Sequence, residues 1–127
     1  MPDLQSPTES ELAILRVLWD REPCSVREVH EAIAATKPVG YTTVLKTLQI
    51  MFDKGLVKRD ERQKAHLYRS ALPAPRMQKQ LVDDLVERAF GGAADQLVMH
   101  ALSGRKATPE EIEKLRSLLA TLETKQR

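Results

Sequence analysis

The 127-residue sequence has little of several residue types: one cysteine, five glycines and only 4% aromatic residues. The single cysteine, Cys24, excludes an internal disulfide bond. Scarce aromatic residues leave a core of leucine, valine and alanine, which favours helices. The sequence also lacks an apolar run long enough to cross a membrane and a leader with a basic start and an apolar middle. We therefore expect a soluble, cytoplasmic protein with no membrane insertion.

Charge is distributed unevenly along the chain, although the net charge is only +2. Residues 1–36 contain three basic and seven acidic residues, whereas residues 37–72 contain eight basic and three acidic residues. Residues 73–127 are nearly balanced. The basic middle third suits a polyanionic partner such as DNA, although a solvated surface can also produce such an excess.

Three helix starts are marked by capping boxes, in which a hydroxyl residue precedes a glutamate by three positions. They are Thr8 and Glu11, Ser25 and Glu28, and Thr108 and Glu111. A further helix is predicted from about Tyr41 to Lys54, where Gly55 provides a left-handed cap. Two short runs, 56–59 and 66–71, separated by a charged stretch, predict a β-hairpin. Beyond Pro73 and Pro75 the chain reads as helical to its end.

The helix predicted at 41–54 has two unlike faces. Its apolar stripe is expected to comprise Tyr41, Val44, Leu45, Leu48 and Phe52. Its other face is expected to be polar, with Thr42, Thr43, Lys46, Gln49 and Asp53. Ile50 and Met51 fit neither description.

Three helices followed by a hairpin predict a mainly α fold: a winged helix-turn-helix DNA-binding domain over residues 1–72. The third helix of such a domain enters the DNA major groove. Residues 73–127 are predicted to form a helical dimerisation domain, because their apolar seam needs a partner to cover it. The dimer residues we expect are Leu81, Leu85, Leu97, Ile112, Leu115, Leu119 and Leu122. Folding of this arm back onto the first domain is the alternative.

The predicted DNA contacts fall into two groups. Thr42, Thr43 and Lys46 lie in the first turns of the third helix, where hydroxyl and amino groups can reach base edges. The other group is expected to contact backbone phosphate, from the start of the second helix and from the hairpin tip. It comprises Ser25, Arg27, Arg62, Lys64 and His66. The plainer interpretations are a helix cap for the threonines and a flexible charged turn for the hairpin tip.

Several motifs resemble the penicillinase-repressor family of bacterial transcription factors, the BlaI/MecI type. They are the Leu-Trp pair at 18–19, the Tyr-Thr-Thr-Val run at 41–44, the Lys-Gly-Leu-Val run at 54–57 and Tyr68. The resemblance extends from about Ser6 to about Leu122. It implies a dimeric repressor on a palindromic, double-stranded DNA operator, with Thr42, Thr43 and Lys46 facing the DNA.

The resemblance also implies that repression ends when the arm is cut, downstream of a membrane zinc-protease sensor that acts indirectly. The cut bond aligns with His100–Ala101, where well-known members have an Asn-Phe pair that this sequence lacks. A copper-responsive branch has a cysteine cluster near its C-terminus, and the absence of cysteine after Cys24 excludes that branch.

Other classes of protein fit the sequence less well. His30, His66 and His100 lie on separate elements without metal-ligand spacing, and there is no glycine-rich phosphate loop. We therefore expect no enzyme activity, no catalytic residue, no metal and no cofactor. Cys24, just before a helix start, is expected to be a packed residue rather than a reactive thiol. Two alternatives stay open: a winged-helix module for protein–protein contact, and a ligand-responsive winged-helix regulator without proteolytic control.

Overall fold

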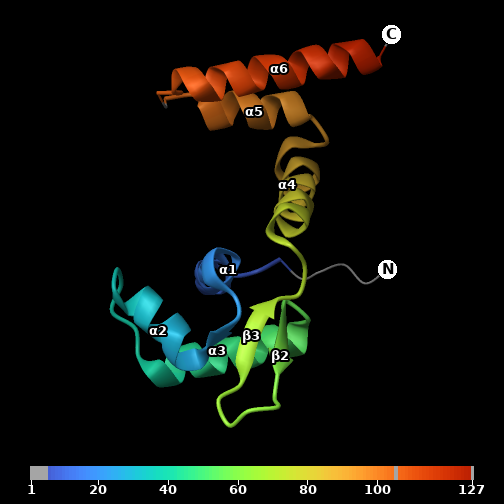
Figure 1. The fold of residues 1–127 in the computed structure, drawn as a ribbon. Helices are drawn as coiled ribbons and strands as arrows, with labels where there is room; N and C mark the ends of the chain where they lie inside the picture. Colours follow the sequence, from blue (N-terminus) through green and yellow to red (C-terminus); the bar gives the residue numbers. More distant parts are fainter. Residues whose placement is uncertain (1–5, 105, 127) are drawn as a thin grey trace. The chain divides into compact units, whose positions relative to one another are not determined.

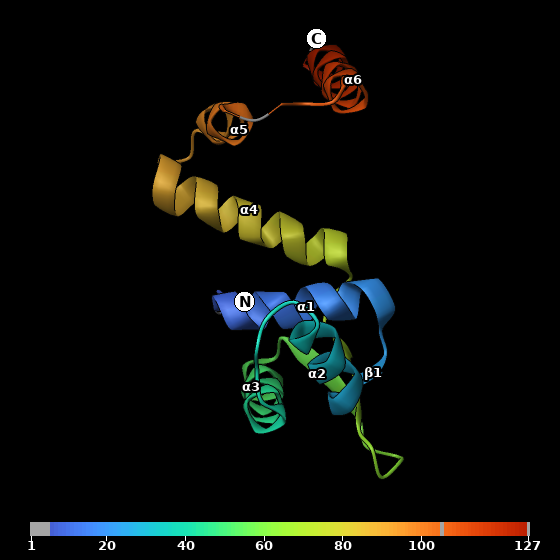
Figure 2. The same cartoon turned by 90° about the vertical axis from the view of Figure 1, so that its left-hand side faces the viewer.

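The structure is a computed structural model that describes residues 6–104 and 106–126. Within these residues the chain forms, in order, α1 (Glu9–Arg21), β1 (Cys24–Ser25), α2 (Val26–Ala34), α3 (Tyr41–Lys54), β2 (Val57–Asp60), β3 (Leu67–Ser70), α4 (Ala74–Phe90), α5 (Ala94–Leu102) and α6 (Pro109–Lys125). The elements divide into two compact units, one up to Val82 and the other from Asp83. In the first unit the β2–β3 hairpin extends beyond the helices (Figures 1 and 2).

The helix boundaries follow the predicted local signals. In α1 the backbone N–H of Glu11 donates to Thr8 Oγ1 at 3.2 Å, and the N–H of Thr8 donates to Glu11 Oε1 at 2.8 Å. The same reciprocal pairs form at the starts of α2 and α6. Helix α3 ends at Gly55, whose φ of 82° lies in the left-handed region that glycine adopts without strain. The three capping boxes and the glycine cap are confirmed.

The sheet contains one strand that the sequence did not predict. Strands β2 and β3 form the expected antiparallel hairpin, with Val57 opposite Ser70 and Arg59 opposite Tyr68. Strand β1 adds to the other side of β3, with Cys24 opposite Tyr68. A two-residue strand is too short to show the alternating pattern that identifies strands in a sequence.

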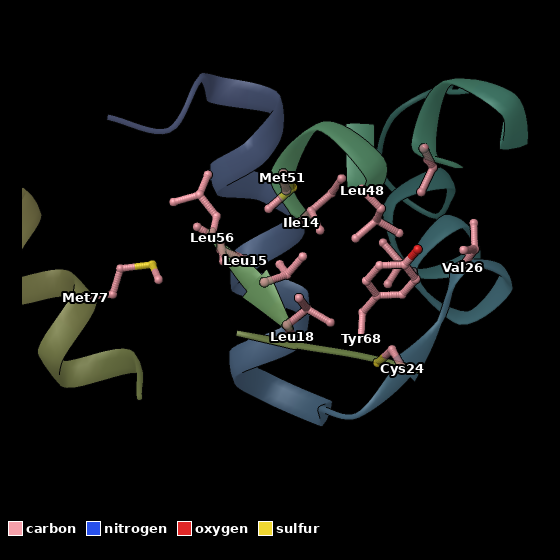
Figure 3. Packing of buried hydrophobic residues seen from close by; sticks show 13 residues of the cluster. Ile14, Leu15, Leu18, Cys24, Val26, Leu48, Met51, Leu56, Tyr68 and Met77 are labelled. Atoms are coloured by element: carbon pink, nitrogen blue, oxygen red, sulfur yellow. The ribbon is translucent and has the colours of Figure 1, made fainter. Parts of the chain in front are cut away.

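The core of the first unit joins α1, α3 and the sheet. Leu15, Leu18, Leu48, Leu56 and Tyr68 are each at most 1% exposed, and Figure 3 shows their side chains gathered between α1, α3 and the hairpin. This packing removes apolar surface from water and is the main force that stabilises the unit.

Two assignments on α3 are corrected by the structure. Tyr41 is 48% exposed and does not belong to the buried stripe, because it lies in the first turn, at the end of the helix. Met51, for which the sequence offered no account, is fully buried, so the buried residues of α3 are Val44, Leu48 and Met51. Ile50, by contrast, is 51% exposed.

The hairpin is anchored to α1 by a chain of hydrogen bonds. Trp19 Nε1 donates to Ser70 Oγ at 3.0 Å, and Ser70 Oγ donates to the carbonyl of Leu72 at 2.7 Å. The Ser70 N–H donates to Glu22 Oε1 at 3.0 Å. The base of the hairpin therefore has a fixed place in the first unit.

Helix α4 begins within the first unit. Pro75 lies in its first turn, where a missing N–H costs no hydrogen bond. Met77 is 1% exposed and belongs to the core of the first unit, and Leu81 packs partly buried against that core. The compact unit thus extends past the boundary expected at residue 72. The functional division at 72/73 stays a prediction.

The second unit is built differently from the first. Neither α5 nor α6 contains a buried residue among those that the structure describes. Large apolar side chains on both helices are at least 41% exposed: Val98, Met99, Leu102, Ile112, Leu118, Leu119 and Leu122. Over residues 6–104 and 106–126, no helix has the length and apolar character needed to span a bilayer.

Candidate nucleic-acid interface

The outward face of α3 presents three polar side chains to solvent. Thr42, Thr43 and Lys46 are all exposed. Among the described residues, none of these three side chains forms a hydrogen bond or an ion pair. One turn further, Thr47 Oγ1 donates to the Thr43 carbonyl at 2.8 Å and is satisfied within the helix. The three predicted base-contacting groups are therefore free to bind a partner.

The N-terminus of α3 differs from those of α1, α2 and α6. Gly40 occupies the cap position of α3 and offers no side-chain acceptor, whereas the other three helices begin with a capping box. The first backbone N–H groups of α3 are consequently available to an external acceptor. A phosphate oxygen is a suitable acceptor, because the helix dipole also favours negative charge at this end.

Two contacts fix α3 against its neighbours. Lys54 Nζ, at its C-terminal end, lies 2.9 Å from both carboxylate oxygens of Glu11, whose side chain is 3% exposed. Although burial alone raises the pKa of Glu11, hydrogen bonds from Thr8 and Lys54 outweigh it and hold that pKa below its usual value. At the other end, His30 Nε2 lies 2.8 Å from the carbonyl oxygen of Val39. Both ends of the helix are thus tied to the rest of the unit.

At the hairpin tip, the structure places one predicted phosphate contact in an ion pair. Arg62 Nη2 lies 2.7 Å from Asp60 Oδ2, and Arg62 Nε lies 3.0 Å from Asp60 Oδ1. The hydrogen bonds from Arg62 lower the pKa of Asp60 to about 2, so this carboxylate stays charged at neutral pH. The Arg62 side chain is 88% exposed. In the free protein, part of the positive charge of Arg62 is nevertheless neutralised by Asp60.

An open groove of about 480 Å³ lies between the start of α2, one side of α3 and the hairpin. Four predicted contacts line it together: Ser25, Arg27, Lys64 and His66. Ser25 Oγ also serves as the helix cap, because it accepts the N–H of Glu28 at 3.2 Å. Thr42, Thr43, Lys46 and Arg62 lie outside this lining. The predicted residues therefore form two neighbouring surfaces, the front of α3 and this groove.

Several residues that line the groove were not predicted from the sequence as site residues. Tyr41, Leu45 and Gln49 line the groove from α3 and recur at i, i+4 and i+8, which places them on one side of a helix. That spacing was visible in the sequence, but Tyr41 and Leu45 were counted as core. Arg59 also lines the groove, from β2. No pattern in the sequence separates it from the other basic residues of the hairpin.

Cys24 is a packed residue, as expected. It is fully buried, and its Sγ donates to the Arg21 carbonyl at 3.3 Å. Burial, followed by the charge of Glu28, raises the pKa of the Cys24 thiol above its usual value. A raised pKa opposes formation of the reactive thiolate.

The predicted dimer residues occupy different surroundings. Leu81 packs against the core of the first unit, whereas Leu85, Ile112, Leu119 and Leu122 are between 41% and 58% exposed. Leu97 and Leu115 are half-buried. His100 and Ala101, the predicted cleavage position, are exposed in the last turn of α5, and the His100 ring lies 5.6 Å from that of Phe90.

The first unit consists of three helices followed by a β-hairpin that is hydrogen-bonded to α1, and its third helix has an exposed polar face. This arrangement defines the winged helix-turn-helix class of DNA-binding fold. Within that class the chain belongs to the penicillinase repressor family, whose model matches residues 7–121.

Individual relatives agree with this assignment. The transcriptional regulator BlaI of Mycobacterium tuberculosis is 35% identical over 119 residues, covering 89% of this chain and 82% of that protein. A penicillinase repressor of Staphylococcus aureus is 21% identical over 116 residues, covering 91% of this chain and 92% of that protein. The structure of monomeric Bacillus licheniformis BlaI in complex with the blaP half-operator is similar in fold, with a TM-score of 0.51 and 18% identity over 58% of this chain and 90% of that one.

Proposed function

We propose that this protein is a sequence-specific, DNA-binding transcriptional repressor that acts as a homodimer on a palindromic operator. The observation that carries the proposal is the unpaired, exposed face of α3 formed by Thr42, Thr43 and Lys46. Membership of the penicillinase repressor family supports it. So does the fold shared with a relative whose structure contains a half-operator. The protein then acts by occupying DNA, not by catalysis.

The front of α3 suits base contacts in the major groove. A threonine hydroxyl can donate or accept a hydrogen bond, and its methyl group can pack on the methyl group of thymine. Lys46, one turn along, can reach a base acceptor or a phosphate. The outer face is neither acidic nor broadly apolar: the exposed large apolar residues of α3 are Ile50 and Tyr41, and Tyr41 lines the groove. A protein-binding role for α3 is therefore less well supported than DNA binding.

The groove suits the sugar–phosphate backbone beside the bases that α3 reads. Lys64, on the hairpin, brings positive charge to one side, and Arg27, on α2, brings it to the other, where Arg27 Nε also lies 3.4 Å from Glu31 Oε1. Contacts of this kind add affinity without reading sequence. In this proposal the front of α3 distinguishes one DNA sequence from another, and the groove adds affinity for any DNA.

Binding to DNA can be tested without knowing the operator. Purified protein selects its preferred duplex from a random library, and its affinity is then compared on that duplex and on the random pool at several salt concentrations. We expect Thr43→Ala and Lys46→Ala to weaken the selected site by about tenfold more than the pool, since one good base contact is worth about 1–3 kcal/mol. Lys64→Ala should weaken both alike and lower the slope of affinity against salt by about one.

Arg16→Ala is the matched control, because Arg16 is an exposed basic residue on α1 outside the groove. It should change neither affinity. Absence of DNA binding, or binding that does not weaken with salt, would refute the repressor function. Equal losses on both DNAs for Thr43→Ala and Lys46→Ala would make these residues phosphate contacts only.

We further infer that α5, α6 and the second half of α4 form the homodimer interface. Their large apolar side chains are exposed in one chain, and burial of such surface is the usual drive for obligate association. Two linked DNA-binding units on one operator also gain affinity, because the second contact becomes intramolecular. Leu85, Ile112, Leu119 and Leu122 are the contact residues we propose from the exposed set.

Release by proteolysis is proposed at His100–Ala101, with a membrane zinc-protease sensor acting indirectly. Proteases favour exposed, irregular segments, so α5 must open before this bond can be cut. Mass spectrometry of the chain from induced cells should find a fragment that ends at His100. Derepression with an intact chain would contradict the proposal and favour control by a ligand.

A further inference from the structure

We propose that Arg59 is a positioning residue that holds the hairpin at a fixed distance from α3, so that the groove and the front of α3 engage one DNA duplex together. This inference rests on the DNA-binding function proposed above. Arg59 itself is not a DNA contact in this view. It acts through Lys64, which the hairpin carries to the groove.

The Arg59 side chain crosses from the hairpin to the recognition helix. Its guanidinium carbon lies 4.0 Å from the centre of the Phe52 ring on α3. Its Nη2 atom lies 3.0 Å from Glu61 Oε1, beyond the end of β2. Hydrogen bonding to Tyr68, followed by the charge of Glu61, raises the pKa of the Arg59 guanidinium above its usual value. One side chain thus links β2 to α3 and to the start of the hairpin tip.

Burial separates Arg59 from the other arginine that forms an ion pair near the hairpin tip. The Arg59 side chain is 19% exposed, whereas that of Arg62 is 88% exposed. A guanidinium stacked on an aromatic face and largely shielded from water gains more from the stack than an exposed one does. The planar arginine fork, which lysine lacks, serves the stack and the ion pair with Glu61 at once, while its Nε atom is buried without a hydrogen-bond partner among the described residues.

The position of Arg59 along β2 explains why the hairpin needs such a link. At the base, Val57 and its partner Ser70 are buried, and Tyr68, which lies opposite Arg59, is buried as well. At the outer end the last paired residues are Asp60 and Leu67, and residues 61–66 form the tip. Strand β3 is also paired with β1, at Tyr68 and Leu67, whereas β2 is an edge strand whose neighbour is β3. Arg59 joins this edge strand to α3 one residue before the strand ends, so in this proposal it sets where the tip lies.

Four variants of the full chain test the proposal. Arg59→Met removes the stack and the charge, Arg59→Lys keeps the charge, and Phe52→Leu keeps an apolar side chain but removes the ring face. Lys58→Met is the matched control, since Lys58 is exposed and adjacent residues of a strand point to opposite faces. Affinity for the selected duplex, its salt slope and the melting temperature are measured for each, with and without Lys64→Ala.

Arg59→Met is expected to weaken binding to the selected duplex by about tenfold, the equivalent of a shielded cation–π contact. The decisive result is the coupling between Arg59 and Lys64. In the wild-type chain Lys64→Ala should lower the affinity for DNA. In the Arg59→Met and Phe52→Leu chains it should cause no further loss, because the hairpin no longer brings Lys64 to the DNA. Arg59→Lys should fall between the wild type and Arg59→Met. Lys58→Met should leave the cost of Lys64→Ala unchanged.

Two results would overturn the inference. One is additive losses for Arg59→Met and Lys64→Ala, or an unchanged Lys64→Ala effect in the Phe52→Leu chain. The other is wild-type binding by Arg59→Lys, which would reduce Arg59 to a charge. These results are distinct from a failure of the proposed function, in which the wild-type chain itself binds no DNA.

Discussion

The two units of the chain differ in how much apolar surface one copy can bury. In the first unit α1, α3 and the hairpin enclose side chains such as Leu15 and Leu48, which are fully buried. In the second unit α5 and α6 contain no buried residue among those described, and Met99 is 70% exposed. Hydrophobic burial is the dominant favourable term in folding. The first unit therefore has a buried core of its own, whereas α5 and α6 leave in one copy the apolar surface that the proposed dimer would cover.

This difference has a consequence for function. The proposed DNA-binding surfaces lie on the unit that has a buried core, while the proposed dimer contacts lie on the unit whose apolar side chains are exposed. If the proposed dimer forms, loss of the second unit would leave each DNA-binding unit to bind its half-site alone. In that proposal, control of the arm changes operator affinity and leaves the surface of α3 unchanged.

Separating the two units should have the largest effect on folding and association. A fragment of residues 1–82 is expected to unfold cooperatively and to stay monomeric, whereas residues 83–127 alone should gain helix only as their concentration rises. Circular dichroism and sedimentation over a range of concentrations test both. A dimeric 1–82 fragment would move the interface to the first unit. Helix content in 83–127 that does not depend on concentration would show that the second unit needs no partner.

Two leucine substitutions test the same contrast in the intact chain. Leu48→Ala removes a fully buried side chain and should lower the free energy of unfolding by about 3–5 kcal/mol at every protein concentration. Leu119→Ala removes a side chain that is 58% exposed in one copy, so its cost should grow with dimer population and vanish in dilute protein. Denaturant titrations at two concentrations distinguish them. A concentration-independent cost for Leu119→Ala would place that residue in an intramolecular contact.

Helix α4 contains both a buried and an exposed apolar residue, so the two units can be compared within one helix. Met77 is 1% exposed and Leu85 is 49% exposed. Met77→Ala should therefore cost about 2–3 kcal/mol in the first unit. Leu85→Ala should cost little there and weaken only dimer formation. Similar costs for both, measured in dilute protein, would mean that the first unit extends further along α4 than Val82.

Local signals predicted much of the first unit, and tertiary context decided the rest. Thr8, Ser25 and Gly55 act through neighbouring backbone, so their roles could be read from the sequence. Tyr41 was misplaced because its burial depends on what lies opposite the first turn of α3, which periodicity does not report.

For the candidate site too, the sequence predicted some features and missed others. The polar front of α3 follows from helical spacing alone. The pairing of Arg62 with Asp60 and the stack of Arg59 on Phe52 depend on side-chain geometry across the hairpin, which the order of charges along the chain does not encode. Sequence reasoning therefore found the basic hairpin but could not assign different roles to its arginines.

The smallest expected effect concerns pH, and it belongs to the first unit because Glu11 and Lys54 both lie there. Because the folded pKa of Glu11 is below its ordinary value of 4.5, the stability that this group contributes is fully present above about pH 4.5. It is lost as the pH falls through the lower, folded pKa. Glu11→Gln should cost about 2 kcal/mol at pH 7, the scale of a hydrogen bond to a charged group.

The measurement is the difference in unfolding free energy between the wild-type chain and Glu11→Gln, followed by urea titration from pH 7 downward. Other carboxylates titrate equally in both chains, so the difference isolates Glu11. It should stay constant to about pH 4.5 and then shrink, because protonation of the wild-type carboxyl removes the charge that the glutamine lacks already. Glu9→Gln, an exposed acid in the same turn of α1, is the matched control and should change little. A difference that stays constant through the acid range would mean that Lys54 stabilises α3 by packing of its stem and not by its charge on Glu11.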